Sequence, residues 1–297
     1  MYKDFQSLLE NVKGKGKMSM AVAAAHDETV LEAVKLAMQH GFLQPILVGD
    51  KALIEKILTQ LGVTEAVEII DQPDVAKAAT EAVELVKAGR AHALMKGIVN
   101  TAVFLRAVLK KDATNKDKRF LSHLAAFEIP GQKKILFMTD VAFNTYPDLE
   151  QKRLLLINAI TALHKLGYAR PNVALLSANE IPSEKMPASI DAQKLVQMSL
   201  AGELPVAEIE GPMALDVIAD AECAVHKKIK SNIAGDVDLV LAPDIEAGNG
   251  IAKAFSHYAG GTMSGLLVGG DVPVILNSRS DTARSKFISI ALALLLK

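Results

Sequence analysis

The residues best suited to chemistry follow two apolar, β-branched runs in the last third of the chain, 239–243 and 272–276. Each run stops abruptly at small and polar residues, and a helical pattern follows, which predicts a strand, a turn and a helix start. In open α/β sheets, ligands bind beyond the carboxyl ends of the strands. The candidates for chemistry are therefore the polar residues at these two ends: Asp244, Asn249, Asn277, Ser278, Arg279 and Asp281.

Ser278 and Arg279 indicate an anion site. A strand-to-helix turn presents free backbone N–H groups and the positive end of the helix dipole. The guanidinium adds a planar fork that matches phosphate. The simpler alternative makes Arg279 a surface residue and Asp281 the N-cap of the last helix, and residue types alone leave both readings open.

A second junction of this kind carries Lys96, Asn100 and Thr101, with Arg106 further along the helix that follows. A lysine, a glycine and two polar side chains at a helix start are typical of a phosphate cradle.

Two aspartates are candidates for a metal site. Asp216 and Asp220 lie four residues apart on an expected helix, where two carboxylates on one face suit a divalent ion. Alternatively, one of them caps the helix and the other is solvated. No histidine pair has metal-ligand spacing, and a single cysteine, Cys223, excludes a thiolate zinc site. Of the histidines, His26 and His123 stand closest to expected strand ends.

The surrounding pattern predicts the scaffold. Strand-like and helix-like runs alternate through the first half, which is typical of a parallel sheet with helices on its faces. Strands are expected there at 18–25, 45–48, 66–70 and 92–95. Two further strands, 120–128 and 134–139, are joined through the turn dipeptide Pro130-Gly131 and predict an antiparallel hairpin. The later elements are expected as helix 149–166, strand 173–176, helix 191–201, strand 206–209 and a final helix from about residue 280.

Composition and charge argue against nucleic acid and membranes as partners. The 297 residues carry a formal net charge of −1, so no sequence-wide attraction to nucleic acid or to an anionic membrane is expected. The N-terminus has no apolar core of a signal peptide, and the longest apolar run, 287–296, is about half of what spans a bilayer. We expect a cytoplasmic protein with a buried C-terminal helix.

Four ordered blocks make the chain resemble the phosphate acetyl/butyryltransferase family. They read Gly211-Pro-Met-Ala-Leu-Asp216, Ser231-Asn-Ile-Ala-Gly-Asp236, Ala242-Pro-Asp-Ile-Glu-Ala-Gly-Asn249 and Asn277-Ser-Arg279. An earlier block, Leu94-Met-Lys-Gly-Ile-Val-Asn-Thr101 with Leu105-Arg106, is similar too. Within the family, Ala178-Asn-Glu180 and Lys185-Met-Pro-Ala188 look like the butyryl branch.

The resemblance implies a two-lobed α/β fold with mostly parallel sheets and flanking helices, similar to isocitrate and isopropylmalate dehydrogenases. The active site would lie in the interlobe cleft. We expect residues 1–117 with 267–297 to form the first lobe, and 118–266 the second. The reaction implied is reversible transfer of a short-chain acyl group, either butyryl, branched or acetyl, between coenzyme A and inorganic phosphate, with an acyl phosphate as the product. The resemblance implies a reaction without a metal or redox cofactor. It also implies a homodimer or a higher homo-oligomer.

The resemblance also assigns residues. Ser278, Arg279 and Asp281 are expected to be catalytic. The acetyl branch has an aspartate seven residues after the serine, where this chain has Ser285. Asp281 takes its place if the last helix starts near residue 280, because residues 281 and 285 then share one face. Substrate-binding residues are expected to be Lys96, Asn100, Thr101, Arg106, Asn179, Gly211, Pro212, Asp216, Asn249 and Lys253.

Two rival functions follow from the same residues. One is a metal- and NAD-dependent dehydrogenase of the related fold, which needs a carboxylate cluster and a nicotinamide site. The other is a non-catalytic acyl-CoA or phosphate-binding protein, which the serine at position 285 keeps open.

Overall fold

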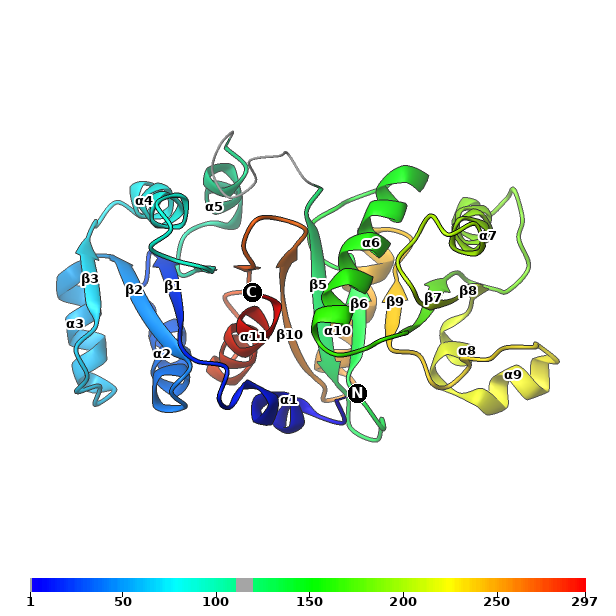
Figure 1. Cartoon of the computed structure of the whole chain (residues 1–297), viewed down its shortest axis with the longest axis horizontal. Helices are drawn as coiled ribbons and strands as arrows, with labels where there is room; N and C mark the ends of the chain where they lie inside the picture. Colours follow the sequence, from blue (N-terminus) through cyan, green and yellow to red (C-terminus); the bar gives the residue numbers. More distant parts are fainter. Residues whose placement is uncertain (1, 111–119) are drawn as a thin grey trace. The chain divides into compact units, whose positions relative to one another are not determined.

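The computed structural model describes residues 2–110 and 120–297, which form two compact units. The terminal unit holds residues 5–110 and 264–297, and the middle unit holds residues 2–4 and 120–263. The boundary expected between residues 117 and 118 lies outside the described residues. Figure 1 shows the whole chain coloured along its sequence.

The terminal unit is built on a mostly parallel sheet with the order β3-β2-β1-β4-β11-β10. Only the last pair, β11 with β10, is antiparallel. Its strands are β1 (Met18–Ala23), β2 (Leu43–Gly49), β3 (Glu68–Asp71), β4 (Leu94–Lys96), β10 (Thr262–Val268) and β11 (Val274–Ile275). Its helices are α1 (Phe5–Val12), α2 (Glu28–Gln39), α3 (Lys51–Gln60), α4 (Val75–Lys87), α5 (Thr101–Val108) and α11 (Ala283–Leu296).

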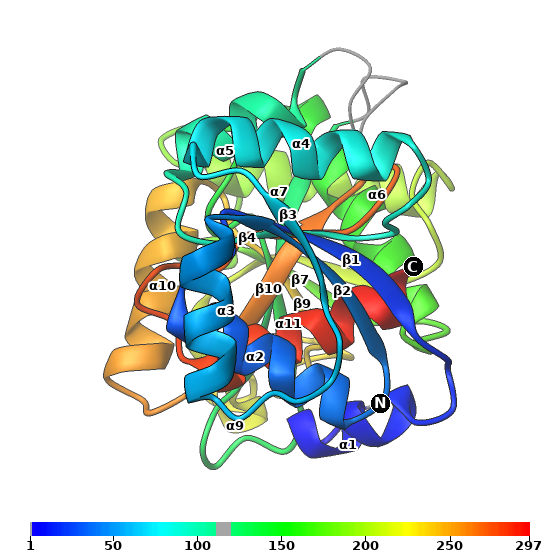
Figure 2. The ribbon, with the colours of Figure 1, turned by 90° about the vertical axis from the view of Figure 1, so that its left-hand side faces the viewer.

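Aspartates start three of these helices. Asp27, Asp50 and Asp74 each accept a hydrogen bond from a backbone N–H of the first helical turn, which satisfies a donor that has no partner within the helix. Figure 2 shows α4 and α5 on the opposite face of the sheet from α2 and α11. The alternation read from the sequence is therefore confirmed as strands with helices on both faces.

The C-terminal helix α11 is buried along nearly its whole length, as expected, and packs on α2 and α1. It begins later than the sequence indicated. Thr282 is its N-cap and accepts from the backbone N–H of Ser285, so the helix starts at Ala283 and not near residue 280. A threonine that closes a ring on the third helical residue outcompetes the aspartate one position earlier.

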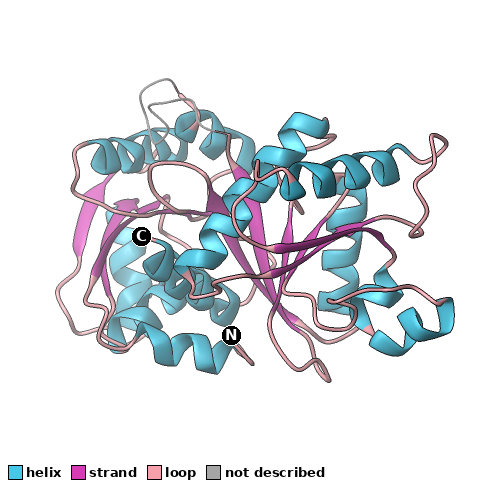
Figure 3. Cartoon of the chain, turned by 45° about the vertical axis from the view of Figure 1, so that its right-hand side comes forward, coloured by secondary structure: helices cyan, strands magenta, loops and turns pink. Residues whose placement is uncertain are grey.

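The middle unit has the strand order β5-β6-β9-β7-β8, parallel except for the β5–β6 hairpin, which confirms that expectation. Its strands are β5 (Ser122–Glu128), β6 (Leu136–Thr139), β7 (Asn172–Leu176), β8 (Glu208–Met213) and β9 (Leu239–Leu241). Its helices are α6 (Leu149–Lys165), α7 (Pro187–Leu200), α8 (Leu215–Ala219), α9 (Ala221–Lys227) and α10 (Ile245–His257). Figure 3 shows helices flanking the strands.

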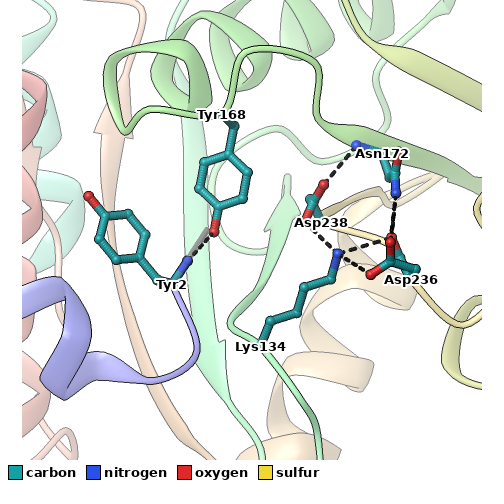
Figure 4. A network of polar contacts seen from close by, with 6 residues as sticks. All are labelled: Tyr2, Lys134, Tyr168, Asn172, Asp236 and Asp238. Atoms are coloured by element: carbon teal, nitrogen blue, oxygen red, sulfur yellow. Dashed lines mark hydrogen bonds and ion pairs between the residues drawn. The ribbon is translucent and has the colours of Figure 1, made fainter.

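Two carboxylates and a lysine tie the base of this sheet together (Figure 4). Lys134 Nζ lies 2.6 Å from Asp238 Oδ1 and 2.7 Å from Asp236 Oδ1. Asn172 donates its backbone N–H to Asp238 Oδ2 at 2.8 Å and its side-chain amide to the backbone oxygen of Asp236 at 2.7 Å. The network links β7 to the segments that enter β6 and β9. It also gives the buried carboxylate of Asp238 a cationic partner in Lys134, without which its burial would be costly.

The same region buries Tyr168, whose Oη accepts from the backbone N–H of Tyr2 at 3.2 Å. Burial raises the pKa of Tyr168 to about 12, with a smaller contribution from Asp238. A tyrosine with a raised native pKa contributes stability that is complete below its unfolded pKa of about 10 and is lost as the pH rises toward 12.

We therefore expect the free energy of unfolding to fall by about 2 kcal/mol more in the native chain than in Tyr168→Phe between pH 10 and 12. Urea titrations at several pH values would measure both proteins, and groups common to the two cancel in the difference. Equal pH dependence of the two proteins would contradict this role.

Two helical expectations in this unit are wrong. Asp216 and Asp220 do not share a helix, because Asp220 ends α8 and caps α9 by accepting from the backbone N–H of Glu222 at 2.9 Å. Helix α7 begins at Pro187 and not near residue 191, since proline suits the first helical position. No helix within the described residues is both long and apolar enough to cross a membrane.

Candidate functional site

The turn between β11 and α11 is organised by Asp281. Its Oδ2 accepts from the backbone N–H of Ser278 at 2.9 Å and from Asn277 Nδ2 at 3.1 Å. Its own backbone N–H reaches the carbonyl oxygen of Ser278 at 3.2 Å. The Ser278 and Ser280 hydroxyls are 3.0 Å apart. The turn therefore leaves the Ser278 and Arg279 side chains exposed on a main chain that is fixed at both ends.

A buried cation lies in the field of this turn. Lys96, at the end of β4, is only 3% exposed and donates to the carbonyl oxygens of Gly97 at 3.0 Å and Val99 at 3.3 Å. Burial lowers the pKa of Lys96, as do the nearby charges of Arg279 and Lys286, while Asp27 and Asp281 oppose the shift. The unit thus gathers positive charge at the carboxyl ends of β4 and β11, which suits an anion.

Gly97 allows Lys96 to occupy this place. A Cβ on Gly97 would lie 2.2 Å from the carbonyl oxygen of Ala24, and the Gly97 N–H donates to Ala23 O at 2.8 Å. The chain after β4 therefore lies directly against the end of β1, where no side chain fits.

The other residues expected at this junction have local roles in the structure. Asn100 is the N-cap of α5 and accepts from the backbone N–H of Ala102 at 2.9 Å. Thr101 opens the helix, and Arg106 lies in its last turn; both are exposed. The side-chain oxygen of Asn100 is therefore used by the helix start, and exposure leaves Thr101 and Arg106 open to a ligand.

The geometry by which Asp281 was expected to replace the acetyl-branch aspartate is wrong. Asp281 precedes the N-cap Thr282, so it does not stack one turn before Ser285 on a helix face. Ser285 is buried, at 7% exposure, and its carbonyl oxygen accepts from Ser289 Oγ at 3.1 Å. Any role of Asp281 in proton transfer must come from its place in the turn.

The middle unit contains a second ordered loop that the sequence did not single out. Asp140 follows β6, is 2% exposed, and accepts from the backbone N–H groups of Ala142, Phe143 and His123 at 2.8–2.9 Å. The side-chain amide of Asn144 adds a 2.7 Å bond. An aspartate directly after an apolar strand, with an asparagine four residues further, was the available signal.

Helix α10 is fastened to this loop. Asn249 donates its amide to the carbonyl oxygen of Val141 at 2.9 Å, and Asp244 caps the helix through the backbone N–H of Ala247. Gly248 is buried, and a Cβ there would lie 2.4 Å from the backbone oxygen of Asp140. The family-like block 242–249 thus brings two strand ends together, and Asn249 has a structural partner in it.

Gly248 and its neighbour Gly250 form a matched pair, since a Cβ on Gly250 would meet nothing within 4 Å. We expect Gly248→Ala to lower the free energy of unfolding by about 1–3 kcal/mol, because either α10 or the loop at Asp140 must move to make room for the Cβ. Gly250→Ala, in the same helix, should raise it by about 0.5–1 kcal/mol. Urea denaturation of both variants tests this, and two shifts of the same sign would disprove it.

The remaining expected residues lie at the ends of β7 and β8. Lys227 Nζ bridges Glu180 at 3.0 Å and Asp216 at 2.9 Å, so Asp216 pairs with a lysine and not with Asp220. Asn179 is exposed and accepts from the backbone N–H of Ile181 at 3.2 Å. In β8, a Cβ on Gly211 would lie 2.6 Å from Leu175 Cβ, which explains the glycine before Pro212.

The structure gives less support to the remaining candidate residues. Lys253 is half-buried on α10. His26 Nδ1 accepts from the backbone N–H of Asp50 at 3.3 Å, a structural role. Across residues 2–110 and 120–297, no group of three histidine, cysteine or acidic side chains is placed to hold a metal ion. Burial raises the pKa of the Cys223 thiol, which disfavours it as a nucleophile.

Comparison with known proteins shows the family. Residues 70–294 match the family model described as phosphate acetyl/butaryl transferase. The chain is 42% identical to the phosphate butyryltransferase of Clostridium acetobutylicum over 296 residues, which are 99% of this chain and 98% of that protein. The chain belongs to the phosphate acetyl/butaryl transferase family. It is an acyltransferase enzyme, as the sequence predicted, and the dehydrogenase alternative is not favoured.

Solved structures agree on the fold. The branched-chain phosphotransacylase from Enterococcus faecalis matches with a TM-score of 0.82 and 32% identity, covering 94% of this chain and 98% of that one. The 4-hydroxythreonine-4-phosphate dehydrogenase from Klebsiella pneumoniae matches with a TM-score of 0.56 at 14% identity, over 95% and 99% of the two chains, which shows likeness of fold alone. The expected α/β fold, with mostly parallel strands and flanking helices, is confirmed.

Proposed function

We propose that this phosphate acyltransferase moves a short acyl group, butyryl or branched, reversibly between coenzyme A and inorganic phosphate. The observation that carries the proposal is the turn 278–281. It exposes a hydroxyl and a guanidinium on a fixed main chain close to the buried cation of Lys96. The names of the butyryltransferase and branched-chain relatives support the same chain-length range.

In the direction that consumes acyl phosphate, the thiol of coenzyme A loses its proton and the sulfur attacks the acyl carbon. The bond from that carbon to the phosphate oxygen breaks, and phosphate leaves with the electron pair. An ordinary thiol has a pKa near ~8.5, so a positioned base contributes roughly 10²–10⁴-fold at neutral pH. We assign this base to Asp281, whose two described hydrogen bonds both use Oδ2.

Arg279 would bind the phosphoryl oxygens through its fork and stabilise the charge on the leaving phosphate. Ser278 would donate its hydroxyl to the phosphate or to the developing oxyanion. Lys96, with Thr101 and Arg106 on the following helix, would attract the phosphates of either substrate. In the middle unit, the proposed substrate-binding residues remain Asn179, Gly211, Pro212, Asp216, Asn249 and Lys253.

Direct attack by the sulfur requires neither an enzyme nucleophile nor a Lewis acid, so we propose that the reaction needs no metal or redox cofactor. EDTA is then expected to leave the rate unchanged, and inhibition reversed by added metal would contradict this. We further propose a cytoplasmic homodimer: the family resemblance implies the homodimer, and a single cysteine, which can form no intrachain disulfide, fits a cytoplasmic setting.

The deciding experiment measures coenzyme A release from acetyl-, propionyl-, butyryl- and branched acyl-CoA, with and without phosphate. We expect release that depends on phosphate and is fastest for butyryl or branched substrates. Because one methylene is worth only ~1–3 kcal/mol, neighbouring chain lengths should differ by about 10–200-fold at most. Binding of acyl-CoA without phosphate-dependent release would favour a non-catalytic binding protein.

A further inference from the structure

Lys286 is a buried lysine in an unusual place. It is the fourth residue of α11 and is only 3% exposed. A cation in the first turn of a helix opposes the helix dipole, and a buried ammonium loses its hydration. Burial lowers the pKa of Lys286, against the opposing effect of Asp281 and Asp27. By these terms alone, an apolar residue would serve this helix better.

The contacts of Lys286 explain why a lysine stands there. Side chains of a helix lean toward its N-terminus, so Lys286 Nζ reaches back to the turn that precedes α11. It donates to the carbonyl oxygen of Asp281 and, at 3.4 Å, to that of Ser278. These two carbonyl groups bracket Arg279 and Ser280. The ammonium thus holds the turn from the main-chain side, while Asp281 Oδ2 holds it through the N–H of Ser278.

We propose that Lys286 is a positioning residue of the acyl transfer: its ammonium fixes the main chain of residues 278–281 so that the Ser278 hydroxyl and Arg279 guanidinium keep their orientation. The inference deepens the proposed function and rests on it. Lys286 does not touch the reacting atoms in this assignment. It acts through the turn, and a displacement of about 1 Å at such a turn can cost about 10²-fold in rate.

Lys286→Met tests the assignment, because methionine keeps the length of the side chain and removes the donors. We expect kcat to fall by about 10–10²-fold, with the KM for phosphate within about twofold of wild type, because uniform binding is not what is lost. The midpoint of thermal unfolding should not fall. Hydrogen exchange of the backbone amides of Ser278 and Asp281 should become faster.

Lys35→Met is the matched control. Lys35 belongs to the same unit and also donates to a backbone carbonyl oxygen, that of Leu61 at 2.6 Å, but lies on α2. Its loss should leave kcat and the exchange of the turn unchanged. Lys286→Arg guards against a folding defect of the methionine variant, since it retains a donor; it should stay within about tenfold of wild-type kcat and exchange more slowly than Lys286→Met.

Several results would overturn the inference. Wild-type kcat and exchange in Lys286→Met would show that the turn holds without the ammonium. A raised KM for phosphate with kcat and exchange retained would make Lys286 a direct phosphate ligand. If Lys286→Met does not fold, Lys286→Arg decides. Wild-type kcat together with faster exchange of the turn in that variant would show that the rate does not depend on how firmly the turn is held, which overturns the inference. Absence of phosphate-dependent turnover in the wild type would refute the proposed function instead, and the exchange measurement would still report on the turn.

Discussion

Arg279→Lys is expected to lower kcat/KM by about 10²–10³-fold, with phosphate as the substrate most affected. Lysine keeps the positive charge but replaces a planar, five-donor fork by a single strongly hydrated point. The proposed role needs two parallel donors on the phosphoryl oxygens as charge moves to the leaving group, and one such donor is worth about 10²–10³ in rate. Steady-state kinetics in both directions would measure the loss.

Arg284→Lys provides the control. Arg284 is also exposed and lies five residues further, in the first turn of α11, without a place in the turn 278–281. It should behave like the wild type. Near-normal turnover of Arg279→Lys would remove Arg279 from the reaction, whereas equal losses in both variants would point to a general effect of surface charge.

Asp281→Asn should reduce turnover by about 10²–10⁴-fold while binding of coenzyme A stays largely intact. The turn makes this substitution informative. Both described hydrogen bonds to the carboxylate, from the Ser278 N–H and from Asn277 Nδ2, end on the same oxygen. The single carbonyl oxygen of an asparagine can accept both, so the shape of the turn is kept and the negative charge is lost.

A thiol-release assay at saturating substrates, with coenzyme A binding followed separately by calorimetry, would separate the two effects. A wild-type rate in Asp281→Asn would mean that the base lies elsewhere. An equal loss in binding and turnover would indicate that Asp281 serves the turn alone.

Local sequence signals predicted most of the scaffold because they report local physics. The aspartates at 27, 50 and 74 and the apolar strands between them specify strand-helix units without help from the rest of the chain. Where tertiary contacts decide, prediction failed. Strand β10 was not among the expected elements, yet its Ser264 is fully buried and its hydroxyl pairs with that of Ser289 at 2.8 Å.

The residues of the candidate site also fall into those that the sequence predicts and those that only the fold reveals. Ser278, Arg279 and Lys96 could be proposed from the sequence because a strand-to-helix junction is visible as an apolar run followed by polar residues and a helical pattern. Lys286 could not, since a lysine before an apolar run looks like a helix end facing solvent, and only the fold turns it inward. The start of α11 was misplaced because Asp281 and Thr282 are both good caps, and the choice between them depends on the turn before them.

The attachment of the turn to one oxygen of Asp281 has a consequence for the catalytic cycle. If Oδ1 takes up the thiol proton, Oδ2 can keep its bonds to Ser278 and Asn277, so the carboxyl group can be charged and neutral in alternation without releasing its neighbours. The architecture around the substrate would then stay unchanged through every turnover. Reversal would need no conformational reset, which suits a catalyst that runs its reaction in either direction.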